Sequence, residues 1–129
     1  MRGLHKDGSA IRVMAVDDSP VTRKMIKKAL EPKGFEIVGE AGNGRDAINL
    51  YNKIKPDVIT MDITMPIMDG LEAALAIKKL NPQQKIIMLS AMSDQDLVAK
   101  AKSWGINYFC PKPFKPDEMA DIVIKVTNS

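Results

Sequence analysis

Several polar side chains follow apolar runs of the sequence, at the point where each run ends. The set consists of Asp17, Asp18, Asp62, Ser90 and Lys112. Three carboxylates that lie close together cannot all ionise comfortably unless a cation lies between them. Mg²⁺ suits such a group, because it commonly binds one or two carboxylates and keeps several waters. The residue types therefore favour a magnesium site, provided that the fold brings these residues together.

The same set has the chemistry to hold a phosphoryl group on Asp62. Mg²⁺ and the ammonium group of Lys112 would balance the charges of the carboxylates. One phosphoryl oxygen would then lie on the metal, a second would accept a hydrogen bond from Ser90, and a third would pair with Lys112. Charge-assisted hydrogen bonds of this kind contribute about 1.5–3 kcal/mol each. Phosphoryl transfer depends mainly on positioning and charge stabilisation, and these residues could supply both.

The elements that must position this set alternate along the chain. The sequence predicts strands over 11–16, 35–40, 57–61, 85–89 and 106–110, and helices over 20–32, 44–54, 70–80, 94–104 and 115–126. Short strands that are apolar throughout are typical of a parallel sheet with helices on both faces. Ligands of such sheets bind at the carboxyl ends of the strands. The polar set falls at that edge, so we expect its members to converge.

The composition fits one ordinary globular domain. The chain has 129 residues, 45% of them hydrophobic and 27% charged, with a net charge of +3. No apolar run approaches the roughly 20 residues of a membrane span, so we expect no membrane association. Basic residues gather at positions 23, 24, 27 and 28 without interleaved aromatic residues, so we expect a solvated helix face and no direct nucleic-acid binding.

The ends of the chain and its cysteine content bear on organisation and location. We expect residues 1–9 to be a flexible leader and residues 10–129 to form the domain. Cys110 is the only cysteine, and the leader has no apolar stretch typical of a secretory signal. Both features favour a reducing, cytoplasmic location.

The chain resembles the receiver domains of response regulators, and among them the single-domain chemotaxis type, which is CheY-like. The resemblance rests on the pair Asp17-Asp18, on "MDITMPIMDG" around Asp62, on "LSAM" at Ser90 and on "FCPKPF" around Lys112. It covers the chain from about residue 11 to the end. It implies an α/β fold of the (βα)5, flavodoxin-like type, in which a doubly wound five-stranded parallel sheet has the order 2-1-3-4-5 that CheY and flavodoxin share.

The resemblance implies roles for the acidic residues. Asp62 would accept a phosphoryl group from a histidine kinase. Asp18, Asp62 and the backbone carbonyl of Thr64 would bind Mg²⁺ directly, with Asp17 assisting, and Mn²⁺ could substitute. The side chain of Thr64 would lie over the phosphoryl group, where we hypothesise that it tunes dephosphorylation.

The resemblance also implies a switch. Ser90 would move toward the phosphoryl group, Lys112 would pair with it, and the ring of Phe109 would turn inward. The face formed by the last two helices and the strand between them would then bind a downstream protein. Phe109 stands where many members have tyrosine, so no hydroxyl is available there for a partner. The bond between Lys112 and Pro113 would be a cis peptide.

Three functions stay open at this stage. The first is a freestanding, phosphorylation-dependent binding module in chemotaxis or flagellar motor-type signalling. It would be a monomer or would dimerise on phosphorylation, and it would not be an enzyme beyond self-phosphotransfer and autodephosphorylation. The second is a receiver domain cut from a larger DNA-binding or effector regulator; the short stretch after the last predicted helix favours the freestanding form. The third is an aspartate-nucleophile phosphohydrolase, which would need a second aspartate as acid–base where this chain has Thr64.

Overall fold

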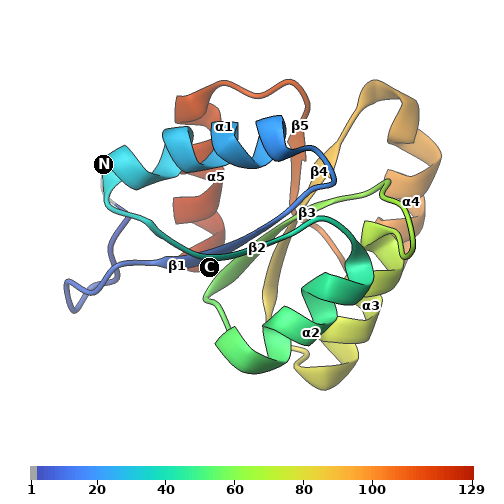
Figure 1. The fold of residues 1–129 in the computed structure, drawn as a ribbon, viewed down its shortest axis with the longest axis horizontal. Helices are drawn as coiled ribbons and strands as arrows, with labels where there is room; N and C mark the ends of the chain where they lie inside the picture. Colours follow the sequence, from blue (N-terminus) through green and yellow to red (C-terminus); the bar gives the residue numbers. More distant parts are fainter. Residues whose placement is uncertain (1–2) are drawn as a thin grey trace.

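Five parallel strands form a central sheet in the order β2-β1-β3-β4-β5, between two layers of helices (Figure 1). The computed structural model describes residues 3–129. Its strands are β1 (Arg12–Val16), β2 (Glu36–Ala41), β3 (Val58–Asp62), β4 (Lys85–Ser90) and β5 (Phe109–Pro111). Its helices are α1 (Pro20–Leu30), α2 (Gly44–Ile54), α3 (Gly70–Leu80), α4 (Gln95–Ser103) and α5 (Pro116–Thr127), with short 3₁₀ helices η1 (Glu31–Lys33) and η2 (Met92–Asp94). The expected fold class and strand order are confirmed.

The strands bury both of their faces, because successive side chains point to opposite sides of the sheet. Met14, Ile59 and Met61 pack in the core under α2, α3 and α4. Val13 and Val58 pack in the second core, under α1 and α5. Every residue of β3 is buried, which explains why the residues before Asp62 are apolar except for Thr60.

Side-chain caps fix where the helices near the carboxyl edge of the sheet begin. The Ser19 hydroxyl accepts a hydrogen bond from the Thr22 N–H at the start of α1, and Asp69 accepts one from the Glu72 N–H at the start of α3. These caps satisfy N–H groups that have no partner within the helix. Each cap anchors a loop that leaves the sheet at this edge.

Two boundaries differ from the prediction by more than one residue. Helix α1 ends at Leu30 rather than at residue 32, because Pro32 lacks the N–H that would continue the helix. Strand β5 begins at Phe109 rather than at residue 106. The N–H of Ile106 still donates to the carbonyl of Ala101, after a left-handed Gly105 with φ of 86°, so residues 106–108 lie in the loop between α4 and β5.

The segment before β1 folds back against the amino end of the sheet. The Gly3 N–H donates to the Lys33 carbonyl at 2.7 Å, and Leu4 forms an antiparallel bridge with Ala10. His5 Nε2 lies 2.8 Å from Asp57 Oδ2. The flexibility expected for residues 1–9 stays a prediction, and residues 1 and 2 of that leader lie outside the described residues. Within residues 3–129, no helix has both the length and the apolar character that membrane crossing requires.

Candidate functional site

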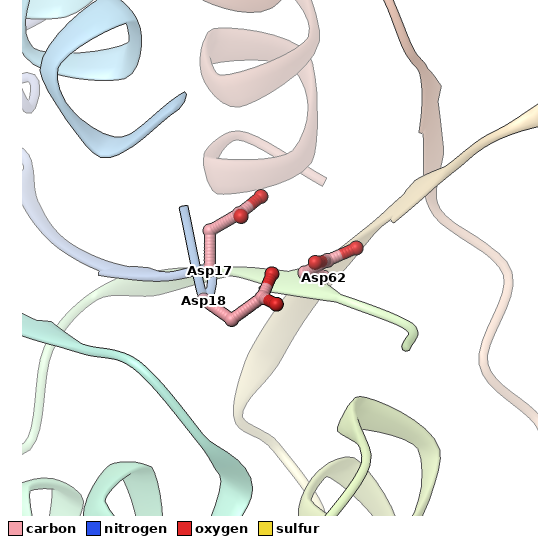
Figure 2. A group of neighbouring side chains, drawn as sticks. All are labelled: Asp17, Asp18 and Asp62. Carbon is pink, nitrogen blue, oxygen red and sulfur yellow. The ribbon is translucent and has the colours of Figure 1, made fainter. Parts of the chain in front are cut away.

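Asp17, Asp18 and Asp62 converge at the carboxyl ends of the neighbouring strands β1 and β3 (Figure 2). Val16 pairs with Met61 in the parallel ladder, so the next residues, Asp17 and Asp62, leave the two strands side by side. Each aspartate places a carboxylate oxygen within 4.8 Å of an oxygen of the others. The sheet register therefore assembles the acidic group that the sequence predicts.

Asp17 is the most constrained of the three aspartates. Its side chain is fully buried, and its Oδ1 accepts a hydrogen bond from the Ser19 N–H at 2.9 Å. Its own N–H donates to the carbonyl of Ala41 at the end of β2, at 3.0 Å. The loop after β1 is thus tied to both α1 and β2, and the Asp17 carboxylate has one fixed orientation.

Lys112 supplies the positive charge that faces this acidic group. Its Nζ lies 2.7 Å from Asp17 Oδ2 and 3.1 Å from Asp62 Oδ1. Burial alone would lower the pKa of Lys112, but the hydrogen bonds and charges of Asp17 and Asp62 outweigh it and raise that pKa. The lysine therefore remains an ammonium ion between two carboxylates.

Asp62 is less easily ionised than an ordinary aspartate. Burial and the negative charge of Asp17 raise its pKa to about 6, although Lys112 acts in the opposite direction. One ammonium group is thus insufficient to balance the cluster. A second cation beside Asp62 would lower this pKa.

The donor set fits a hard divalent cation such as Mg²⁺. Asp17 Oδ2 is buried, and its partner among the described residues is the ammonium group of Lys112 at 2.7 Å. Asp18 is exposed and its carboxylate has no hydrogen-bond or ion-pair partner among the described residues. Carboxylate oxygens that lie close together are the chemistry that Mg²⁺ selects. The structure therefore brings together Asp17, Asp18 and Asp62, while the role predicted for the Thr64 carbonyl stays a prediction.

The loop between β3 and α3 carries Thr64 and turns sharply. The Gly70 N–H donates to the Ile63 carbonyl at 2.7 Å. A Cβ at Gly70 would lie only 1.7 Å from the carbonyl oxygen of Asp62. Thr64 itself is exposed, with Oγ1 3.5 Å from Asp94 Oδ1, so the predicted backbone ligand lies on the loop that closes directly over the end of β3.

Ser90 and Phe109 lie on the neighbouring strands β4 and β5. Ser90 is the last residue of β4, and its carbonyl accepts the Lys112 N–H at 2.8 Å. Ser90 and Lys112 also line a hollow of about 290 Å³ together with Met92 and Val98. Phe109 is half-buried, and Lys102 Nζ lies 5.6 Å from its ring centroid. The Lys112–Pro113 peptide bond is cis, as the resemblance implies.

Sequence reasoning missed one residue of this site, Arg23. We interpreted the basic residues of α1 as a solvated face, whereas Arg23 Nη1 donates to the Asp17 carbonyl at 2.6 Å. Its position six residues after Asp17, near the start of a capped helix, was the available signal. That position alone does not distinguish an arginine that turns back onto the loop from one that extends into solvent.

Comparisons with known proteins agree with this geometry. The family model of the response regulator receiver domain matches residues 13–124. The chemotaxis protein CheY of Thermotoga maritima is 44% identical over 117 residues, which are 91% of this chain and 98% of that protein. The CheY of Bacillus subtilis is 44% identical over 119 residues, covering 92% of this chain and 99% of that protein. A chain of the CheX–CheY–BeF3–Mg²⁺ complex from Borrelia burgdorferi has a TM-score of 0.90 and 31% identity, with 96% of this chain and 95% of that chain covered.

Proposed function

Because this chain belongs to the response regulator receiver domain family, we propose that it accepts a phosphoryl group on Asp62 from a histidine kinase and relays that signal to a downstream protein. Receiver domains of the CheY type are signalling proteins of two-component systems rather than enzymes. The observation that carries the proposal is the contact of one lysine, Lys112, with both Asp17 and Asp62 inside a group of three converging carboxylates.

In the proposed transfer, an oxygen of the Asp62 carboxylate forms a bond to phosphorus. The bond between phosphorus and the kinase histidine nitrogen breaks, and its electron pair stays on that nitrogen. Mg²⁺, held by Asp18, Asp62 and the Thr64 carbonyl with Asp17 beside them, would stabilise the ionised carboxylate and the phosphoryl oxygens. Lys112 already lies 3.1 Å from Asp62 Oδ1, within reach of a phosphoryl oxygen on that carboxylate.

The second part of the proposal is the switch. The Ser90 hydroxyl turns toward the phosphoryl group, and the Phe109 ring turns inward. The hollow of about 290 Å³ beside Ser90 supports this movement, because it leaves room between β4 and α4. The face formed by α4, β5 and α5 then changes its affinity for the downstream protein by favouring one of two pre-existing conformations.

The names of the relatives support a pathway for this switch. The two curated relatives compared above are both chemotaxis proteins, and we propose chemotaxis or flagellar motor-type signalling on that basis. The single cysteine, Cys110, is buried and unpaired, which suits the reducing cytoplasm where we place this signalling.

Intact-mass spectrometry after incubation with acetyl phosphate tests the proposed acceptor. We expect one phosphoryl adduct on the wild-type protein with Mg²⁺, and none with EDTA or in Asp62→Asn. Asp57→Asn is the matched control, because Asp57 precedes β3 at the opposite edge of the sheet and should keep the adduct. An adduct that persists in Asp62→Asn, or its absence from the wild type, would overturn the assignment.

A further inference from the structure

Arg23 joins the loop that carries Asp17 and Asp18 to the end of β2. Its Nη1 donates to the Asp17 carbonyl at 2.6 Å, and its Nε donates to Glu40 Oε1 at 3.2 Å. The side chain is only 20% exposed. Two different N–H groups of one guanidinium thus hold two separate elements together.

The carbonyl that Arg23 holds belongs to the peptide unit that leads into Asp18. A peptide unit is planar, so fixing the Asp17 carbonyl also fixes the direction of the Asp18 N–H and Cα. The Asp18 side chain is exposed and has no hydrogen-bond or ion-pair partner among the described residues. Its carboxylate therefore depends on its backbone for orientation, and Arg23 is the side chain that anchors that backbone.

The other end of Arg23 is itself anchored. Glu40 Oε2 lies 2.5 Å from Lys27 Nζ, one helical turn after Arg23 in α1. The hydrogen bond from Lys27 is the main cause that lowers the pKa of Glu40. Glu40 also precedes Ala41, whose carbonyl accepts the Asp17 N–H. The end of β2 thus holds Asp17 on both sides, directly through Ala41 and indirectly through Glu40 and Arg23.

We propose that Arg23 is a positioning residue of the metal site, which holds the peptide unit between Asp17 and Asp18 so that the Asp18 carboxylate faces a divalent cation. This inference rests on the proposed function for the use of that cation. Arg23 contacts neither the metal nor the phosphoryl group in this arrangement. Its fixed fork suits the task better than lysine, because a single ammonium cannot keep both acceptors in the same geometry.

The test is Mg²⁺ binding measured by isothermal titration calorimetry. Arg23→Met removes both hydrogen bonds, and Glu40 keeps Lys27 as a partner. We expect Arg23→Met to weaken Mg²⁺ binding roughly tenfold, the lower end of the range for residues that orient metal ligands. Arg23→Lys should fall between that variant and the wild type. Lys27→Met is the matched control, because it breaks a contact to the same Glu40 without touching Asp17, and we expect less than about a twofold change.

Phosphorylation kinetics separate positioning from a purely structural role. In Arg23→Met, the Mg²⁺ concentration for half-maximal phosphorylation by acetyl phosphate should rise, whereas the maximal rate at saturating Mg²⁺ should match the wild type. Wild-type Mg²⁺ affinity in Arg23→Met, or an equal loss in Lys27→Met, would overturn the inference. If Arg23→Met does not fold, Arg23→Lys takes its place, and wild-type Mg²⁺ affinity in that variant would overturn the inference. Wild-type protein that binds Mg²⁺ without forming an adduct would overturn the proposed function and leave the role of Arg23 standing.

Discussion

The two sides of the site differ in how firmly they are built. One side, which we name the acid side, consists of β1, β3 and α3 with the loops that carry Asp17, Asp18 and Asp62. The other, the aromatic side, consists of η2, α4 and β5, with Phe109. Helix α3 buries five of its eleven residues, whereas α4 buries one of nine, Ala101. Segments with few buried side chains open at lower free energy, so the acid side can hold charges in place while the aromatic side rearranges.

The edge strand of the sheet points to the same difference. Strand β5 has only three residues, and it pairs with β4 alone at the edge of the sheet. Lys112 follows β5, yet its Nζ contacts the acid side, so this one residue joins the two sides.

The largest expected effect compares one leucine from each side. Leu71 near the start of α3 is buried, and Leu97 near the start of α4 is only partly buried. We expect Leu71→Ala to lower the free energy of unfolding by about 3–5 kcal/mol, as for other buried leucines. Leu97→Ala should cost about 1 kcal/mol, because less apolar area leaves water there. Urea denaturation measures both, and equal costs would contradict the proposed difference between the two sides.

A smaller effect is expected when the contacts of Lys112 between the two sides are removed. Lys112→Met takes away the ammonium group that Asp17 and Asp62 share. Removing one partner of a buried ion pair commonly costs 3–5 kcal/mol, and we expect about 2–3 kcal/mol because Lys112 is 25% exposed. Saturating Mg²⁺ should recover part of this loss in urea denaturation. Lys115→Met, at an exposed lysine before α5, is the control, and a metal-independent loss would show that charge balance is not the cause.

The smallest expected effect is a pH dependence confined to the acid side. The pKa of Asp62 is raised to about 6 by burial and by Asp17, above the value near 3.9 of an unfolded chain. The folded state therefore binds a proton at Asp62 more tightly than the unfolded chain does. The stability that this proton contributes is fully present below about pH 4 and is lost as pH rises through about 6. In EDTA, we expect the wild type to gain about 1 kcal/mol when pH falls from 7.5 to 5.

Asp62→Asn completes this comparison, because asparagine does not titrate. The variant should be more stable than the wild type at pH 7.5 in EDTA, and its stability should lack the component assigned to Asp62. Thermal denaturation across the same pH range measures both quantities. A variant that keeps the full pH dependence of the wild type would show that another group is responsible.

Most of the acid side follows from the sequence, and less of the aromatic side does. The apolar strands predict a parallel sheet, and the sheet brings the ends of β1 and β3 together whatever the details of the loops. The start of β5 does not follow in this way, because Ile106 is apolar and buried whether it lies in a strand or in the turn after α4. The contacts of Arg23 with Asp17 and of His5 with Asp57 cannot be predicted from the sequence either. Each depends on which of several nearby acceptors a long or terminal side chain reaches, and spacing along the chain does not determine that.

The tight turn at Gly70 limits which sequences can encode this site. Any side chain there would have to occupy the space of the Asp62 carbonyl, 1.7 Å from where its Cβ would be. Substitutions at position 70 would therefore prevent correct folding, whatever their effect on signalling. Ile67, three residues earlier in the same loop, is 71% exposed and has a left-handed φ of 69°, so its side chain has room although its backbone conformation favours glycine or asparagine. Space for side chains in this loop thus lies at its exposed tip, while the position where it enters α3 accepts only glycine.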